Sequence, residues 1–317
     1  MLTTGLPVSR LAGYAPALPT PFDANDKVDF STLSNLCDRQ IQLGANAFVV
    51  CGTTGEAPTL SRAEQEEIVR VAVGMARGRI PVIAGAGSNA TSHAIELARD
   101  AERAGADALL CVVPYYNKPT QIGLYAHFNA VADSVGLPII LYDVPSRTGC
   151  PLADNTIARL AQRPQFIGLK DATGNLARPL LLRAVLGPEF RLLSGDDASA
   201  MAFIAQGGNG CISVTSNVAP GLCRSMYLAL KRGQITQAQR FAADFMKLTL
   251  ALFSETNPVP VKYALNLLNV MSPRVRLPLV ELNNETKADI ASVLAHLCER
   301  YSGYVIGTLS AAEPSVH

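Results

Sequence analysis

The most informative run in this 317-residue chain is Phe166-Ile167-Gly168-Leu169-Lys170-Asp171-Ala172-Thr173-Gly174. It begins as a short apolar segment and ends in charged, small and turn-forming residues. Such a run is typical of a buried strand of a parallel sheet. A lysine at the end of an apolar strand is unusual, because its ammonium group loses hydration there. Lys170 is either a structural cation paired with a carboxylate such as Asp171, or an amine used in chemistry, and both interpretations stay open at this point.

Seven further apolar runs of the same kind occur along the chain, and segments with helical spacing separate them. These runs cover residues 15–19, 47–51, 81–84, 108–113, 138–142, 191–194 and 211–215. Alternation of apolar strands with helices predicts a parallel sheet covered on both faces. Eight such units match an α/β fold of the (β/α)8 TIM-barrel type. A doubly wound sheet remains the alternative, because strand order in a sheet cannot be inferred from the sequence.

The helical segments carry recognisable start signals, and the end of the chain shows mainly helical patterns. Asp29 precedes one periodic segment, and Ser61 with Glu64 forms a capping box ahead of another. Beyond residue 221 the helix-like segments cover residues 222–231, 236–253, 259–268 and 286–297. We therefore predict a (β/α)8 barrel over residues 1–222 and an all-helical C-terminal domain and tail over residues 223–317. Residues 302–317 show no interpretable pattern.

The composition argues against several functional classes. Hydrophobic residues make up 49% of the chain, and 27 Lys and Arg residues balance 26 Asp and Glu residues. A balanced charge disfavours nucleic-acid binding, and apolar runs far shorter than about 20 residues disfavour a membrane span. Residues 1–10 lack the apolar region of a secretory signal. Seven dispersed cysteines without a C-x-x-C pair indicate buried thiols in a reducing compartment, so we expect a cytoplasmic protein.

The loops that follow the strands are where a (β/α)8 barrel carries its reactive groups. In this chain those loops are rich in polar residues. They read Gly52-Thr53-Thr54-Gly55-Glu56, Pro114-Tyr115-Tyr116-Asn117, Tyr142-Asp143-Val144-Pro145-Ser146-Arg147, Lys170-Asp171 and Ser194-Gly195-Asp196-Asp197. Residues from distant parts of the sequence are thus expected to meet at one end of the barrel.

Lys170 and Tyr142 end neighbouring strands, so we expect their side chains to meet at the barrel mouth. An amine that desolvation keeps neutral attacks a carbonyl to form an imine, and a nearby phenol can move the protons that this step requires. Thr53 and Thr54 offer hydroxyl and N–H groups to a carboxylate. Arg147 offers a two-point contact to a second carboxylate. Taken singly, Tyr142 is as easily a core aromatic and Arg147 a solvated surface residue.

Two other motifs have simpler interpretations. Gly85-Ala86-Gly87-Ser88-Asn89-Ala90 has the spacing of a dinucleotide-binding turn, but it opens the third strand–helix unit rather than the first, and we predict an ordinary tight turn. The pair Asp196-Asp197 has no third carboxylate close in sequence, so we predict a helix cap rather than a metal site.

Six motifs together resemble the dihydrodipicolinate synthase family of Schiff-base-forming, Lys-dependent aldolases, a superfamily that includes N-acetylneuraminate lyase. The motifs are G-T-T-G-E (52–56), P-Y-Y-N-K-P (114–119), Y-D-V-P-S-R-T-G (142–149), G-L-K-D-A-T-G (168–174), S-G-D-D (194–197) and I-S-V-T-S-N (212–217). The resemblance extends from about residue 13 to residue 282. The sialic-acid lyases of the superfamily lack the S-R-T-G sequence that is present here.

The resemblance implies a lyase that condenses pyruvate, held as a Schiff base, with L-aspartate 4-semialdehyde in the diaminopimelate route to lysine. It makes Lys170 the Schiff-base lysine. A proton relay is implied for Tyr142, Thr53 and Tyr116, with Tyr116 reaching into the site of a neighbouring subunit. Substrate binding is implied for Thr54, Arg147, Gly195 and Ile212. The family uses no metal and no organic cofactor, and it usually forms a homotetramer, a dimer of dimers.

One departure from the family pattern concerns regulation. Lysine-inhibited members hold the effector's ammonium groups with an acidic residue and a histidine. The matching residues here are His93 and Gln65, while Asn89 and Tyr115 are kept, so we expect a degenerate lysine site with weak or absent inhibition. Two other functions stay open: a sister pyruvate-dependent aldolase or lyase acting on a sugar acid or another aldehyde, and a catalytically silent barrel that senses 2-oxo acids.

Overall fold

The computed structural model describes residues 11–301 of the chain. Residues 1–10, in which we predict no secretory signal, and residues 302–317, which show no sequence pattern, lie outside the described residues.

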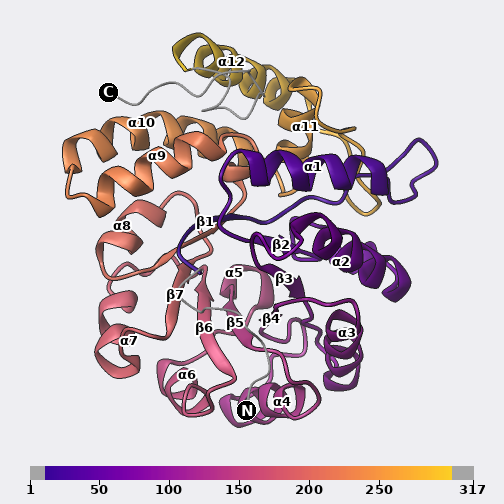
Figure 1. Cartoon of the computed structure of the whole chain (residues 1–317), viewed down its shortest axis with the longest axis vertical. Helices are drawn as coiled ribbons and strands as arrows, with labels where there is room; N and C mark the ends of the chain where they lie inside the picture. Colours follow the sequence, from indigo (N-terminus) through magenta and orange to yellow (C-terminus); the bar gives the residue numbers. More distant parts are fainter. Residues whose placement is uncertain (1–10, 302–317) are drawn as a thin grey trace.

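Eight parallel strands form a ring at the centre of the molecule (Figure 1). They are β1 (Gly13–Pro16), β2 (Phe48–Val50), β3 (Val82–Gly85), β4 (Ala108–Val112), β5 (Ile139–Asp143), β6 (Phe166–Asp171), β7 (Arg191–Ser194) and β8 (Gly210–Ser213). Strands β2 to β8 pair with their neighbours in chain order, and β8 pairs with β1. Between β1 and β2 the ring is joined by a bridge between Ala17 and Val49. This order confirms the barrel and excludes the doubly wound sheet.

The predicted apolar runs all correspond to strands, although β1 begins at Gly13, two positions before the predicted run. Helices on the outside of the ring are α1 (Phe30–Gln42), α2 (Arg62–Ala76), α3 (Thr91–Arg103), α4 (Gln121–Ala132), α6 (Asp154–Leu160), α7 (Arg178–Leu186) and α8 (Ala200–Ala205), and the short α5 (Pro145–Thr148) follows β5. The predicted caps are present: the Asp29 carboxylate accepts a hydrogen bond from the Thr32 N–H, and Ser61 and Glu64 form a capping box.

Apolar side chains fill both sides of the strand ring. One buried cluster occupies the interior of the barrel and contains Ala15, Val49, Ile83, Leu110, Ile140, Tyr142, Ile167, Leu193 and Ile212. A larger cluster lies between strands and helices and includes Phe48, Leu109, Phe128, Leu141 and Leu169. Alternate residues of a strand therefore face the interior and the helices, as expected for a packed (β/α)8 barrel.

The C-terminal helices cover one side of the barrel (Figure 1). They are α9 (Pro220–Lys231), α10 (Ile235–Leu252), α11 (Val259–Leu267) and α12 (Asn284–Arg300), which confirms the four predicted helices. Their apolar faces share a buried cluster with barrel residues such as Tyr14, whose ring centroid lies 6.0 Å from that of Phe245. The division of the chain into domains at residue 222 stays a prediction.

A buried ion pair joins these helices to the barrel mouth. The ammonium group of Lys262 on α11 contacts the carboxylate of Glu56, and both side chains are inaccessible to solvent. Lys262 also donates a hydrogen bond to the Arg274 carbonyl at 2.7 Å, and the Arg276 N–H donates to Glu56 at 3.0 Å. Burial lowers the pKa of Lys262 to about 8, although the charge of Glu56 opposes this shift. The turn that contains Thr53 and ends at Glu56 is thus held by residues more than 200 positions later in the chain.

The two motifs with simpler interpretations are structural. A Cβ atom at Gly85 would overlap the Cys51 carbonyl, and one at Gly87 would lie 2.6 Å from the Val112 nitrogen, so both glycines allow close packing between strands. Asp196 accepts a hydrogen bond from the Ser199 N–H in the turn before α8, but the N-cap of α8 is Ser199 and no side chain caps this helix, so the prediction of a helix cap is wrong for Asp196. Asp197 does not cap the helix either: its carboxylate accepts hydrogen bonds from two N–H groups beyond β8, because its side chain is buried between the two loops.

The cysteines are free thiols, and six of the seven are buried. Cys298 is exposed on α12, so the prediction of burial is wrong for this residue. Cys298 lies on the solvent side of α12, where its small side chain has few packing partners. Within residues 11–301, no helix is both long and apolar enough to cross a bilayer.

The Lys262–Glu56 pair generates a stability prediction. Lys262→Met leaves the Glu56 carboxylate buried without its cation, so the free energy of unfolding should fall by about 3–5 kcal/mol in urea denaturation. The matched control is the double variant Lys262→Met, Glu56→Gln, which removes the stranded charge and should recover much of this loss. A loss below about 1 kcal/mol for Lys262→Met would show that the pair does not anchor the C-terminal helices.

Candidate active site

A cavity of about 370 Å³ opens at the carboxyl ends of strands β2 to β5. It is lined by residues from the loop after β2, the turn after β3, the end of β4 and the segment after β5. The residues singled out from the sequence that line it are Thr53, Gln65, His93, Tyr115, Tyr142 and Arg147. Threonine and tyrosine hydroxyls and one arginine thus face a common space whose walls also include Leu110, Val112 and Val144. Such a space suits a small polar ligand.

Lys170 and Tyr142 are direct partners in the sheet. The register of β5 and β6 places Tyr142 opposite Lys170, and the Lys170 ammonium lies 4.2 Å from the centroid of the Tyr142 ring. Lys170 is 6% exposed. The predicted meeting of these two side chains is therefore present. Lys170 itself does not line the described cavity. Tyr142 lines the cavity and contacts Lys170, so its side chain connects the amine to the cavity.

The structural interpretation of Lys170, a pair with Asp171, does not describe the geometry. Asp171 follows Lys170 on β6, and neighbouring residues on a strand point to opposite faces. Its carboxylate lies 3.3 Å from the Arg178 guanidinium and accepts hydrogen bonds from the N–H and hydroxyl of Thr173. Asp171 is therefore occupied on the helix side of the barrel, and Lys170 faces the interior.

Gly195 is needed for the placement of Lys170. A Cβ atom at Gly195 would lie 2.9 Å from Lys170 Cε and 3.1 Å from Lys170 Cγ. Only glycine leaves room for the lysine stem at this point of the loop after β7. Ile212 is buried on β8 in the same interior cluster as Tyr142. Gly195 thus borders the Lys170 side chain, and Ile212 borders the barrel interior. Neither residue lines the described cavity.

The two threonines after β2 differ in their surroundings. Thr53 lines the cavity. Thr54 is buried, does not line it, and its hydroxyl accepts a hydrogen bond from the Asn257 side-chain amide at 3.0 Å. Thr54 is therefore placed by the C-terminal region of the chain.

Tyr116 is separated from the other predicted residues. Its side chain is 89% exposed, it does not line the cavity, and its backbone has φ 74° in the left-handed region. A bulky residue with positive φ is strained unless its surroundings require that conformation. Within one copy of the chain, the structure does not bring Tyr116 to the other site residues.

Three of the four predicted effector residues line the same cavity as Thr53, Tyr142 and Arg147. Gln65 and His93 line it, and the Gln65 amide donates weak hydrogen bonds to the carbonyls of Ala57 and Leu60. His93 Nδ1 lies 3.5 Å from Glu96, whose carboxylate also pairs with Arg62. Asn89 is held differently, since its carbonyl accepts a hydrogen bond from the Asn117 side chain.

Sequence reasoning missed Arg178 and Asn257. Arg178 is buried and contacts two carboxylates at the ends of β5 and β6, and Asn257 contacts Thr54. For Arg178 a signal was available: Asp143 and Asp171 occupy equivalent positions at the ends of adjacent strands, which calls for a cation between them. For Asn257 no local signal exists, because its partner is 203 residues away.

Comparison with known proteins identifies one family for this chain. The profile of the Dihydrodipicolinate synthetase family matches residues 10–297. The 4-hydroxy-tetrahydrodipicolinate synthase of Cereibacter sphaeroides is 50% identical over 286 residues, which cover 90% of this chain and 98% of the relative.

Two solved structures show the same architecture. The 4-hydroxy-tetrahydrodipicolinate synthase of Methylacidiphilum fumariolicum SolV superposes with a TM-score of 0.90 at 37% identity, covering 94% of this chain and 100% of that one. A monomeric dihydrodipicolinate synthase variant superposes with a TM-score of 0.88 at 37% identity, covering 91% and 97%. The family resemblance inferred from the sequence motifs is confirmed, and the chain belongs to the Dihydrodipicolinate synthetase family.

Proposed function

We propose that this chain is a 4-hydroxy-tetrahydrodipicolinate synthase, a lyase that joins pyruvate to L-aspartate 4-semialdehyde. The observation that carries the proposal is the buried amine of Lys170 at 4.2 Å from the centroid of the Tyr142 ring. The activity matches that of the relatives, which align with this chain over nearly their whole length. Thr53 and Arg147 line the cavity that Tyr142 also lines, which supports a role of this end of the barrel in imine formation and carboxylate binding.

The chemistry begins with attack of the Lys170 nitrogen on the ketone carbon of pyruvate. The carbinolamine that forms loses water to give an imine, and Tyr142 with Thr53 moves the protons that addition and dehydration require. Loss of a proton from the methyl carbon of the bound pyruvate gives an enamine. This carbon then forms a bond to the aldehyde carbon of the semialdehyde, whose oxygen becomes a hydroxyl. Attack of the semialdehyde's own amine on the imine carbon closes the ring and releases Lys170.

Binding of the two carboxylates is assigned to opposite parts of the site. Thr53 and Thr54 follow β2 and would receive the pyruvate carboxylate through hydroxyl and N–H groups. Arg147 lies on α5 just beyond Tyr142, lines the cavity and is solvent-exposed, so its guanidinium is available to the carboxylate of the second substrate. Gly195 and Ile212 would border the bound pyruvate from β7 and β8.

We also propose a homotetramer built as a dimer of dimers, in which Tyr116 completes the proton relay of a neighbouring subunit. Two observations support this assembly. Tyr116 is almost fully exposed in a left-handed backbone conformation. The outer face of α7 exposes Leu180, Leu181 and Val185, an apolar surface of the kind that a second copy would bury. The free thiols support a reducing compartment, the cytoplasm, as the place of the reaction.

Trapping with borohydride tests the imine directly. Incubation with pyruvate and borohydride should add to Lys170 the mass of pyruvic acid less one oxygen atom, as read by peptide mass spectrometry. Lys170→Ala should give no adduct and lose the condensation activity, because the nucleophile is gone. An adduct on another lysine, or a protein that binds pyruvate without one, would favour the sensor interpretation over the enzyme.

Arg147 tests the second substrate. Arg147→Ala removes a bidentate, charge-assisted contact, so the KM for aspartate semialdehyde should rise by about 10–100-fold while trapping of pyruvate is retained. Steady-state kinetics with each substrate varied in turn measures this split. Equal turnover of a sugar-acid aldehyde by the unaltered enzyme would instead favour the sister aldolase.

The effector residues generate a prediction about feedback. Lysine should inhibit weakly or not at all, because His93 supplies no carboxylate for its ammonium groups and Glu96 is already paired with Arg62. His93→Glu should lower the half-inhibitory lysine concentration by about 5–150-fold, whereas the uncharged control His93→Gln should not. Half-inhibition of the unaltered enzyme by micromolar lysine would contradict the prediction.

A further inference from the structure

Two carboxylates stand side by side at the ends of the strands that carry Lys170 and Tyr142. Asp143 and Asp171 are register partners on β5 and β6, one position beyond the pair formed by Tyr142 and Lys170. Asp143 is 0% exposed and Asp171 is 3% exposed. Because side chains alternate along a strand, both carboxylates point away from the barrel interior, toward the surrounding helices. Two adjacent buried carboxylates repel each other and cannot both stay ionised without a cation.

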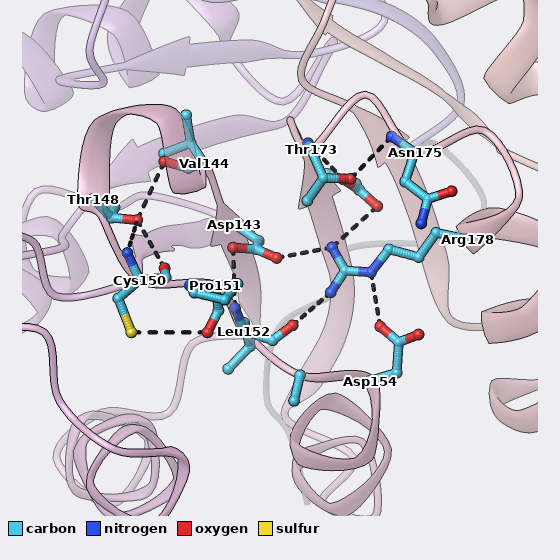
Figure 2. A network of polar contacts seen from close by, with 12 residues as sticks. Asp143, Val144, Thr148, Cys150, Pro151, Leu152, Asp154, Thr173, Asn175 and Arg178 are labelled. Atoms are coloured by element: carbon cyan, nitrogen blue, oxygen red, sulfur yellow. Dashed lines mark hydrogen bonds and ion pairs between the residues drawn. The ribbon is translucent and has the colours of Figure 1, made fainter.

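Arg178 supplies that cation. Its Nη1 lies 2.8 Å from an Asp143 oxygen and 3.3 Å from an Asp171 oxygen, so one guanidinium nitrogen bridges the two strand ends. Nε donates to Asp154 at 2.7 Å, and Nη2 donates to the Leu152 carbonyl at 2.6 Å (Figure 2). The bridging nitrogen and the two other donors all come from a side chain that is 6% exposed. We call Arg178, Asp143 and Asp171 the strand-end clamp.

The clamp also holds the segment that follows Arg147. The Leu152 N–H donates to Asp143 at 3.1 Å, and the Leu152 carbonyl accepts from Arg178 (Figure 2). The Asp143 carboxylate and the Arg178 guanidinium therefore both bind the backbone of Leu152, the first at its N–H and the second at its carbonyl. Three parts of the candidate active site, on β5, β6 and the segment beyond α5, converge on one side chain.

Helix stability does not account for an arginine at this position. Arg178 is the first residue of α7, where the N-terminal end of the helix dipole disfavours a positive charge. Burial of a guanidinium adds a further cost. Both costs are offset by the carboxylates that Arg178 joins and by the Leu152 carbonyl. Burial also raises the pKa of Asp143 although Arg178 opposes that shift, so the carboxylate depends on the guanidinium to stay ionised.

We propose that Arg178 is a positioning residue for imine formation, which keeps Lys170 in register with Tyr142 by joining the ends of β5 and β6. The proposal rests on the proposed function and deepens it. Arg178 touches no substrate, since Asp143 and Asp171 lie on the opposite side of the strands from the reacting amine. Without the bridge, the two carboxylates repel, the strand ends separate, and the Lys170 amine shifts relative to the phenol that serves it.

The experiment compares variants of one helix by the rate of borohydride trapping at saturating pyruvate, together with the half-saturating pyruvate concentration. Arg178→Gln should slow trapping by about 100-fold, the effect of misplacing a reacting group by about 1 Å. Arg178→Lys keeps a charge but cannot make all the contacts. Its trapping rate should therefore lie between that of Arg178→Gln and that of the unaltered enzyme. The matched control is Arg183→Gln, which removes a half-buried arginine of the same helix that caps the carbonyls of Phe190 and Gly207 and does not contact the clamp. It should leave the trapping rate of the folded protein unchanged.

A milder variant covers the case in which Arg178→Gln does not fold. Asp154→Asn weakens one contact of the guanidinium without burying an unpaired charge, because Asp154 is half-exposed. It should fold and slow trapping by about 2–10-fold. Melting temperatures of all variants separate stability from positioning.

The proposal is overturned if Arg178→Gln or Asp154→Asn lowers only the melting temperature, or slows trapping no more than Arg183→Gln does at equal folded fraction. It is also overturned if the entire effect lies in the half-saturating pyruvate concentration, which would indicate a role in binding. Absence of a pyruvate adduct on Lys170 in the unaltered enzyme is a separate result, which would overturn the proposed function and the positioning role together.

Discussion

Charged groups buried at the carboxyl ends of the strands impose the main constraint on this protein. A barrel mouth that presents an amine and its phenol partner to substrate has to keep them among apolar walls, and the residue after each then falls on the helix side of the same strand. Here those residues are Asp171, after Lys170, and Asp143, after Tyr142. Each buried carboxylate needs a partner at contact distance, because the desolvation cost of an ion is several kcal/mol. Arg178 meets that requirement for both at once.

A second pairing of buried charges connects the barrel mouth to the C-terminal helices. Glu56 ends the turn that contains Thr53 and Thr54, and Lys262 and the Arg276 backbone hold its carboxylate. Asn257 adds a direct hydrogen bond to Thr54. The helices beyond β8 therefore do more than cover an apolar surface. They also hold the loop after β2, whose Thr54 precedes Asn257 by 203 positions in the chain, at the point where this loop lines the cavity.

The cavity at the barrel mouth brings the residues proposed for substrate close to those proposed for an effector. Its walls come from the loops after β2 to β5, and they include both the groups assigned to substrate and the polar groups Gln65 and His93 assigned to an effector pocket. A change at one end of this space therefore acts close to the other. His93 lies on a wall of this cavity that continues to Thr53 and Tyr142.

Much of the fold was predictable because its signals are local. Each apolar run that ends in turn residues became a strand, and the caps at Asp29 and Ser61 act within four residues of themselves. The lysine-bearing strand, its tyrosine neighbour and the family motifs were also readable, since strand ends of a barrel share one face. The error at Cys298 arose because burial depends on which side of a helix meets the core, and its apolar neighbours gave no warning of an exposed face.

The sequence alone thus determined the succession of strands and helices along the chain and predicted a barrel with Lys170 as its reactive amine, because hydrophobic periodicity and strand-end chemistry are encoded residue by residue. Only the tertiary structure decided which charges meet. Arg178 reaches Asp143 over 35 positions, and Asn257 reaches Thr54 over 203. It likewise decided that Asp171 faces away from Lys170 and that Tyr116 projects outward. Contacts between residues so far apart depend on the closure of the barrel, and no local pattern records them.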